Sequence, residues 1–314
     1  MPAIQPARPP ERSNPVVFGL VALIAGLAII VAAAGIWWDG GDGPTTVTSV
    51  RGEQVEIWGQ GLYRHDSPFT AGGQRGTDVI VLTLAVPLLI VTAVWYRRDS
   101  LRGTFALSGV LAYLLYVYGS MALGTVAYNG LFLVYVALFS ATLFTLALVL
   151  RGIDGERLAR TVAGPPPRWP GRFMIFAGLV TFGVWMSEPV SHLLGGEVPA
   201  RLDASSTLVT AALDIAVIVP LSLLAGVLLR RGAALGYLIA FPLLGIIVLL
   251  GPTFVAQTIS QLDAGVDFTT AEMAGPIGGF GVTALLATWT MASLLRRLRE
   301  ERAVAADIAL IEAA

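Results

Sequence analysis

Long apolar stretches separated by short polar segments cover most of the chain. A helix needs about 20 apolar residues to cross the roughly 30 Å hydrocarbon core of a bilayer. This pattern predicts an all-α integral membrane protein, a bundle of about eight transmembrane helices of which the fifth is the shortest. The eight stretches are Pro15–Trp38, Val79–Tyr96, Thr104–Leu123, Gly130–Leu150, Phe173–Pro189, Leu208–Leu229, Ala234–Leu250 and Pro276–Leu295.

The first apolar stretch has a second interpretation. Arg8 and Arg12 precede it, and the alanines at 32–34 resemble a signal-peptide cleavage site. Its apolar run is longer than the about 7–15 residues of a signal-peptide core. We therefore expect a retained helix, whereas cleavage would leave seven spans.

The basic residues are placed unevenly along the chain. All 20 are arginine; with a cytoplasmic amino terminus, sixteen fall in cytoplasmic segments. Cytoplasmic loops of membrane proteins carry the excess of positive charge. The sequence therefore predicts that both termini are cytoplasmic. The other four arginines fall in outer segments, at Arg51, Arg64, Arg75 and Arg201.

The polar segments divide the chain into five parts. Residues 1–14 are proline-rich and predict a disordered cytoplasmic N-terminus. Residues 15–150 form a first four-helix half, which includes an ordered outer loop at 39–77. The Pro/Arg-rich segment 151–172 contains three consecutive prolines and predicts an extended cytoplasmic linker. A second four-helix half follows at 173–295, and a charged cytoplasmic tail at 296–314.

The two halves share a short sequence match. Val86–Arg98 reads VPLLIVTAVWYRR and Val219–Arg231 reads VPLSLLAGVLLRR, and Gly103 and Gly236 are separated by the same 133 positions. Each half has an even number of spans, so both halves have the same orientation in the membrane. We interpret the match as a possible duplication into two four-helix repeats, as in the parallel repeats of some transporters.

Composition narrows the chemistry. Charged residues make up only 13% of the chain, against roughly 25% in a soluble domain. The chain has no cysteine, which excludes disulfides and thiol catalysis, and no lysine, which excludes a retinal Schiff base and a GxxxxGKS/T phosphate loop. Its two histidines lie outside the span centres, so we expect no haem and no other cofactor. The net charge of −1 says nothing about a nucleic-acid partner, but the arginines follow the membrane topology and form no binding face, so we expect no such partner.

The segment GQGLYRHDSPFTAGGQRGTDVI, at 59–80, gathers polar side chains just before the second span. Thr45–Trp58 partly alternates, which favours a short extracytoplasmic hairpin upstream. An outer loop of about forty residues is longer than most connections, and such loops are functional or disordered. We expect this loop to fold back as a lid over the outer end of the bundle. In that arrangement Tyr63, Arg64, His65 and Asp66 would face Asp78, Asp214 and Glu188.

Two aspartates lie at or near membrane depth. At ~1.5 Å per residue, counting back from the arginines that end their helices places Asp78 at the outer surface and Asp214 about one turn deeper. A carboxylate inside a bilayer needs a structural or functional reason. Asp214 is interpreted either as hydrogen-bonded to a neighbouring helix end, Arg75 or Arg201, or as a cation or proton site that opens to the outside.

Glu188 and His192 are four residues apart, with Pro189 between them. Together with His65 and Asp66 they offer the ligand types of a metal site. The two histidines are 127 positions apart and no HExxH-type pattern is present, so we predict no metal site. Serines near the histidines lack a GxSxG motif, so catalytic residues stay unknown.

Aromatic and glycine residues also form groups. Tyr113, Tyr116 and Tyr118 come late in the third span and are interpreted as interfacial belt residues or, alternatively, as the lining of a ligand pocket. Gly275 and Gly279 have the spacing that permits close helix packing, and the same segment could instead let the helix end move.

Three segments resemble a family of uncharacterised bacterial multi-pass membrane proteins. They are GLYRHDS, GTDVIVLTLAVPLL and AYNGLFLVYVALFS, within about residues 53–150. The resemblance implies a bacterial plasma (inner) membrane location. It implies no activity.

These features favour a non-enzymatic protein that binds or transports a small solute, an ion or a lipid from the outer face. The lipid bilayer is the expected partner, with a small molecule or lipid as ligand. An accessory subunit of a membrane complex is one alternative. The other is an intramembrane enzyme that uses outer-face Asp, Glu and His side chains on lipid-linked substrates.

Overall fold

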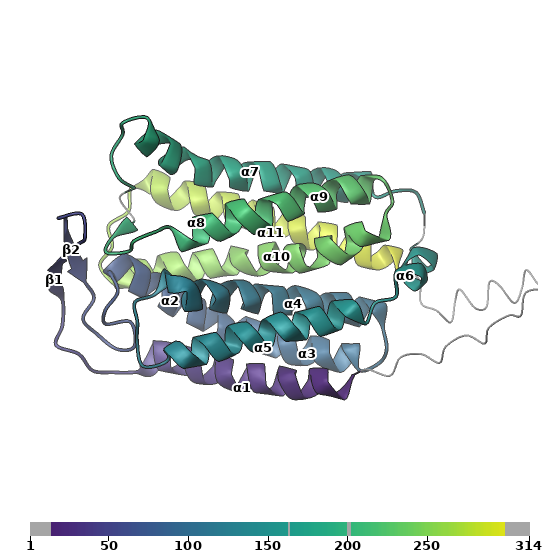
Figure 1. Ribbon diagram of the computed structural model, residues 1–314, viewed down its shortest axis with the longest axis horizontal. Helices are drawn as coiled ribbons and strands as arrows, with labels where there is room; N and C mark the ends of the chain where they lie inside the picture. The colour runs from purple at the N-terminus through teal and green to yellow at the C-terminus, as the bar shows by residue number, and fades with distance from the viewer. Residues whose placement is uncertain (1–13, 163, 200–201, 299–314) are drawn as a thin grey trace, which may run out of the picture.

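The computed structural model describes residues 14–162, 164–199 and 202–298. Eight of its helices are long and apolar enough to cross a membrane, which confirms the predicted all-α bundle (Figure 1). The predicted disordered N-terminus and charged tail lie almost wholly outside the described residues. The spans are Pro15–Trp37, Pro68–Tyr96, Leu101–Thr125, Phe132–Arg151, Arg168–Leu193, Val209–Arg230, Ala234–Asp263 and Glu272–Arg297.

Several spans are built from more than one element. The order is α1 (Pro15–Trp37), β1 (Thr45–Thr48), β2 (Gln54–Ile57), α2 (Pro68–Ile80), η1 (Val81–Ala85), α3 (Val86–Tyr96), α4 (Leu101–Ser120), η2 (Met121–Thr125), α5 (Phe132–Arg151), α6 (Gly155–Thr161), α7 (Arg168–Leu193), α8 (Val209–Leu213), η4 (Asp214–Ile218), α9 (Val219–Arg230), α10 (Ala234–Asp263) and α11 (Thr270–Arg297). The η elements are single wide turns of π-helix. The strands β1 and β2 form the predicted antiparallel hairpin.

Two of the π turns have the same cause. The amide of Val86 bonds to the carbonyl of Val81, and that of Val219 to Asp214, each five residues back. Pro87 and Pro220 follow at once. Proline has no N–H and its ring clashes with the carbonyl four residues earlier, and a wider turn relieves both problems inside a continuous helix.

These π turns lie 133 positions apart, which is the offset of the sequence match. The equivalence continues into the next turn: a Cβ on Gly103 would meet the backbone of Trp95 and Tyr96, and one on Gly236 the backbone of Leu228 and Leu229. In each half the four spans also pack in the same cyclic order. The contacts are α1 with α3, α3 with α4, α4 with α5 and α5 with α1, and likewise α7 with α9, α9 with α10, α10 with α11 and α11 with α7. This arrangement is what two four-helix repeats would produce.

Helix α10 joins the two halves. It packs along α2 and α4 of the first half as well as along α9 and α11 (Figure 1). Glycines allow the close approach: a Cβ on Gly245 would lie 2.2 Å from Cα of Gly109, and one on Gly76 2.4 Å from Cα of Gln257. The halves are therefore one packed bundle.

Some predicted boundaries were wrong. The outer loop was expected at 39–77, but α2 begins at Pro68 with Ser67 as its N-cap. The glycines at 72, 73 and 76, within the expected loop, are buried small residues where α10 packs. Helix α10 extends to Asp263, well beyond Leu250. The linker is not wholly extended, because α6 lies within it and buries Leu158.

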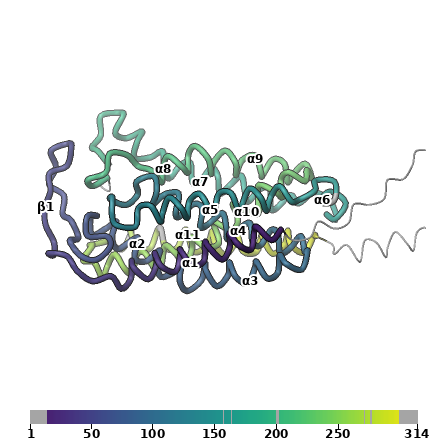
Figure 2. The backbone as a smooth tube through the Cα atoms, turned by 60° about the horizontal axis from the view of Figure 1, so that its bottom comes forward, coloured from purple at the N-terminus to yellow at the C-terminus, as the bar shows by residue number. Residues whose placement is uncertain are grey.

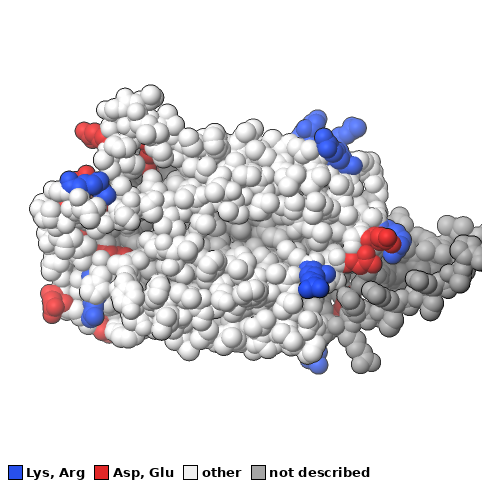
Figure 3. Space-filling view, in the orientation of Figure 1, with Lys and Arg blue, Asp and Glu red and all other residues white. Residues whose placement is uncertain are grey.

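The bundle has two unlike ends. We call the end that carries β1 and β2 the hairpin end, and the opposite end, where α3, α5, α9 and α11 finish, the arginine end. The described ends of the chain both lie at the arginine end (Figures 1 and 2). The space-filling view shows an almost uncharged belt between charged ends, as expected for a chain that crosses a membrane (Figure 3).

Candidate functional site

Residues 38–67 form an ordered loop, here called the hairpin loop, over the hairpin end of the first half. Its base is closed by backbone contacts that only glycine permits. Gly59 has a φ of +71°, and a Cβ there would lie 1.8 Å from the carbonyl oxygen of Gly43. Gly61 has a φ of +62° and donates its N–H to the carbonyl of Gly40 at 2.6 Å. These turns direct Leu62 and Tyr63 into the bundle, where both are buried.

Tyr63 meets a carboxyl inside the bundle. Its hydroxyl donates to Oδ2 of Asp78 at 2.7 Å, and the side chains are 1% and 0% exposed. Its distance from Arg97 along the helix predicted a position at the outer surface, and this prediction is wrong, because Asp78 is buried. It is buried because α2 continues outward to Pro68 and the hairpin loop covers it. Burial, together with the nearby charge of Asp78, raises the pKa of Tyr63 well above its usual value.

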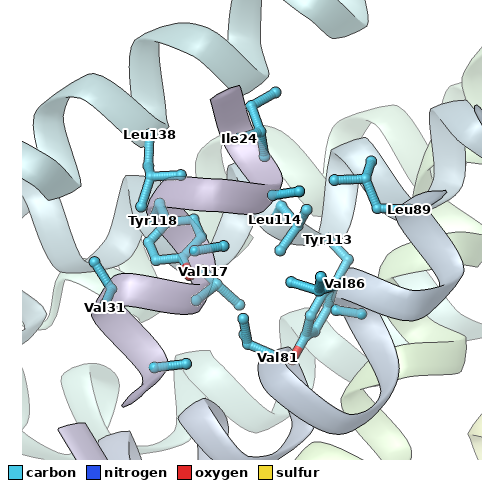
Figure 4. Close-up of a cluster of buried hydrophobic side chains, with 14 of the residues drawn as sticks. Ile24, Val31, Val81, Val86, Leu89, Tyr113, Leu114, Val117, Tyr118 and Leu138 are labelled. Atoms are coloured by element: carbon cyan, nitrogen blue, oxygen red, sulfur yellow. The ribbon is translucent and has the colours of Figure 1, made fainter. Parts of the chain in front are cut away.

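Asp78 lacks a complete set of partners. Its Oδ1 is buried and makes no hydrogen bond within the described residues, and the same is true of the hydroxyl of Tyr118. Helix α1 comes very close on one side: a Cβ on Gly35 would lie 1.7 Å from Oδ2 of Asp78. Figure 4 shows the rings of Tyr113 and Tyr118 of α4 among apolar side chains of the first half. These tyrosines are buried in the core, so they are not interfacial belt residues.

A depression open to solvent lies above this carboxyl. Its volume is about 320 Å³, and its lining includes Gly35, Tyr63 and Arg75. Arg75 precedes Asp78 by three residues on α2 and is close enough to act on it electrostatically. The exposed Asp39 also lines the depression. Tyr63 is therefore the one residue that both lines this depression and hydrogen-bonds to Asp78 among the described residues.

Asp214 forms a second buried carboxyl site. It is 8% exposed and opens the π turn η4. Its Oδ2 accepts a hydrogen bond from Nε1 of Trp185 on α7 at 2.6 Å, and the hydroxyl of Tyr116 on α4 also bonds to it. The partners seen are neutral donors from two neighbouring helices and not Arg75, and Arg201 lies outside the described residues.

Helix α4 connects the two sites. Tyr113 and Tyr118 are near enough to Asp78 to interact with it, and Tyr116 bonds to Asp214. A run of six residues thus places phenols beside a carboxyl in each half. The sequence identified the tyrosine group and both aspartates, but it did not connect them.

Asp66 fastens the hairpin loop to the first half. Its Oδ1 accepts the N–H of Ala127, in the connection between α4 and α5, at 2.6 Å. Burial raises the pKa of Asp66 to about 7, against the opposing effect of this hydrogen bond. The next residue, Ser67, bonds through its hydroxyl to the carboxylate of Asp203, and Arg51 bonds to the carbonyls of Asp203 and Ser205. The hairpin loop is therefore tied to both halves.

The expected lid is correct in one contact and wrong in the others. Tyr63 faces Asp78, but Asp66 bonds to Ala127, and His65 and Arg64 are exposed. Glu188 and His192 are also exposed, near the end of α7, and Nδ1 of His192 lies 3.2 Å from the carbonyl of Gly196.

No group of three or more Asp, Glu, His or Cys side chains within the described ranges could hold a metal ion. Sequence reasoning missed Gly35, Trp185 and Tyr135 as neighbours of the carboxyls. No local signal marks them, because each comes from another helix.

No family model, curated protein or solved structure matches this chain. The resemblance of residues 53–150 therefore has no family model to support it. The spans, the buried carboxyls and the hairpin loop define a multi-pass helical membrane protein.

Proposed function

We propose that this membrane protein binds a small solute or ion at its hairpin end and couples that binding to the loading of a proton or small cation at Asp78. The observation that carries the proposal is the state of the Asp78 carboxyl. It is wholly buried, one oxygen bonds only to Tyr63, and the other has no partner among the described residues. Such a carboxyl is costly to leave unpaired in a membrane protein, and a positive charge or proton would complete it.

The surroundings of Asp78 allow one added positive charge. Among the described side chains that interact electrostatically with Asp78, Arg75 is the only cation. The others are the phenols of tyrosines from three elements. From α10, the neutral side chain of Gln257 donates to Thr77 at 2.8 Å, and the hydroxyls of Thr253 and Tyr113 lie 2.8 Å apart. The phenols are Tyr63 of the hairpin loop, Tyr113 and Tyr118 of α4 and Tyr135 of α5.

Tyr63 is the proposed gate. Tyr63 lines the solvent-facing depression and bonds to Asp78, and it is held by a loop whose turns depend on glycines. Withdrawal of Tyr63 would open Asp78 to water and break the side-chain hydrogen bonds of Tyr63 with Asp78 and Tyr135. Loops that control access to transport sites open and close during the transport cycle.

The arginine pattern supports an orientation for this protein. We place the hairpin end outside and the arginine end in the cytoplasm of a bacterial cell, with the chain in the plasma membrane. The solvent-facing depression then opens to the outside, so the solute or ion would enter from there.

A flux measurement tests the proposal. Purified protein is reconstituted into liposomes that contain a pH-sensitive dye, and a membrane potential is imposed with potassium and valinomycin. We expect proton entry with the wild type and none with Asp78→Asn. The matched control Asp39→Asn removes an exposed carboxyl from the same depression and should leave the flux unchanged. Equal flux through wild type and Asp78→Asn would refute loading at Asp78, and a flux that requires sodium would assign a cation in place of the proton.

An accessory-subunit role has one observation in its favour. The glycines at 275, 278 and 279 of α11 have no neighbour within 4 Å of a Cβ built on them. The expected close packing of Gly275 and Gly279 therefore does not occur among the described residues, although small residues at such spacing pack helices together in membranes. If α11 holds another subunit, Gly279→Leu should reduce the mass of the complex measured in mild detergent from native membranes. The enzyme alternative has no such support, because Glu188, His192 and His65 do not converge.

A further inference from the structure

A second depression, of about 380 Å³, lies at the hairpin end, beside the end of α1 and the start of α5. One wall is the hairpin loop with Arg64 and His65, and the other is the start of α5 with Phe132 and Leu133. Trp38, just after α1, closes one side. Helices α1 and α5 pack against each other, so the depression lies at the end of the bundle face that these two helices form.

The depression is positively charged. Arg64 supplies this charge, and no Asp or Glu is among the described residues that line the depression. Nε of Arg64 donates to Nε2 of His65 at 3.3 Å, which fixes the two side chains relative to each other. Within the described part of the chain, the terminal guanidinium nitrogens of Arg64 make no hydrogen bond. An arginine with free terminal N–H groups can bind a phosphate through two parallel hydrogen bonds.

The rest of the lining is amphipathic and exposed. Tyr128 is 80% exposed and Leu133 77%, and the rings of Tyr128 and Phe132 lie 5.3 Å apart. Indole and phenol rings at the end of a membrane helix sit at the level of the lipid headgroups. A ligand held here would have its anionic group at Arg64 and its apolar part along α5.

Both walls are fixed in place without a ligand. The bond from Ala127 N–H to Asp66 joins the two walls directly. Asn129 accepts the N–H of Leu131 at 2.9 Å and donates to the hydroxyl of Tyr135 at 3.2 Å, which holds the α4–α5 connection. A preformed site loses less conformational entropy on binding.

From these contacts we infer that the depression binds the phosphate group of a membrane phospholipid, with Arg64 as the main contact and the acyl chains lying against α5. This inference does not depend on Asp78 or on the proposed transport. It assigns a role to two residues, Arg64 and His65, that the buried site does not use.

Native mass spectrometry of the full-length protein in neutral detergent tests the inference, with short-chain phosphatidylglycerol as the probe. We expect discrete lipid adducts, and an affinity at least about tenfold lower for Arg64→Gln, because a charge-assisted bond to phosphate is lost. Arg172→Gln, an exposed arginine at the arginine end, makes the same change of charge and should bind as the wild type. Equal loss in both variants would overturn the site.

A second pair of variants does not disturb Arg64. Gly130 lines the depression and has open space where a Cβ would be. Gly130→Glu places a negative charge in the site and should weaken binding, whereas the neutral Gly130→Gln should weaken it much less. Equal binding by these two would contradict a phosphate ligand. Displacement of the lipid by inorganic phosphate at equal concentration would show a site for free phosphate and overturn the lipid assignment.

Discussion

Asp66 makes attachment of the hairpin loop depend on pH. Its pKa is raised from 3.8 to about 7 by burial, so the attached loop binds a proton more tightly than the detached loop. The stabilisation is complete below about pH 4 and is lost as the pH rises through about 7, at about 1.4 kcal/mol per pH unit. We expect the protection of the Ala127 amide against hydrogen exchange, corrected for intrinsic rates, to fall about tenfold per unit in this window.

Asp66→Asn is the decisive variant for this effect. The amide keeps an oxygen acceptor for Ala127 N–H but does not titrate, so the protection should become independent of pH. Asp39→Asn, which changes an exposed carboxyl in the same loop, should keep the wild-type dependence. Wild-type protection that stays constant across the window would contradict the prediction.

Gly35 tests the fit around Asp78. A Cβ there would lie 1.7 Å from Oδ2 of Asp78 and 3.0 Å from the Tyr63 ring, so Gly35→Ala should displace the carboxyl and break the bond to Tyr63. We expect a loss of about 1–3 kcal/mol of stability, seen as a lower apparent melting temperature. Gly26→Ala on the same helix meets nothing within 4 Å and should not lower it. If the two variants melt alike, the close contact is not formed in the protein.

At the scale of elements, the sequence predicted the number of spans but not all of their limits. Apolar length identifies a helix that faces lipid, and it found α1, α5 and the span made of α8, η4 and α9 closely. It failed for α2, whose first turns are polar and glycine-rich. These turns pack against α10, where Gln261 bonds to the carbonyl of Phe69 and, further along α2, Gln257 bonds to Thr77; both partners lie far away in the sequence.

In the candidate site, too, contacts between residues close in sequence were predicted and contacts between distant helices were not. A polar loop just before a span indicated that Tyr63 could reach Asp78, because the two lie close in sequence. The contacts of Trp185 with Asp214 and of Gly35 with Asp78 depend on how helices from distant positions pack. Local patterns contain no information about such packing, so they were not predicted.

The crossing of α4 and α10 gives a prediction at this scale. These helices meet backbone to backbone at Gly109 and Gly245, where a Cβ on Gly245 would lie 2.2 Å from Cα of Gly109. Gly245→Ala must push the helices apart, and backbone cannot give way as a side chain can. We expect a clearly lower apparent melting temperature, with a loss of about 1–3 kcal/mol. Gly183→Ala on α7, where the space is open, serves as the control and should melt as the wild type.

At the scale of the whole molecule, the two halves are similar in path but differ in their buried carboxyls. Asp78 precedes the π turn of the first half, whereas Asp214 begins the π turn of the second. One is covered by a loop that reaches solvent, and the other is held by two helices. In such a fold the hairpin loop of the first half could open at Asp78 while the second half stays rigid. This division agrees with the proposal that Tyr63 alone is the gate.

The absence of cysteine makes the orientation directly measurable. Thr46→Cys places one thiol on the exposed hairpin, and Ala159→Cys places one on the exposed side of α6 at the opposite end of the bundle. Because arginine-rich loops are retained in the cytoplasm, we expect a membrane-impermeant maleimide to label Thr46→Cys in intact cells and Ala159→Cys only after permeabilisation. The wild-type chain supplies the blank. Labelling of Ala159→Cys in intact cells would reverse the membrane orientation, and the depression above Asp78 would then open to the cytoplasm.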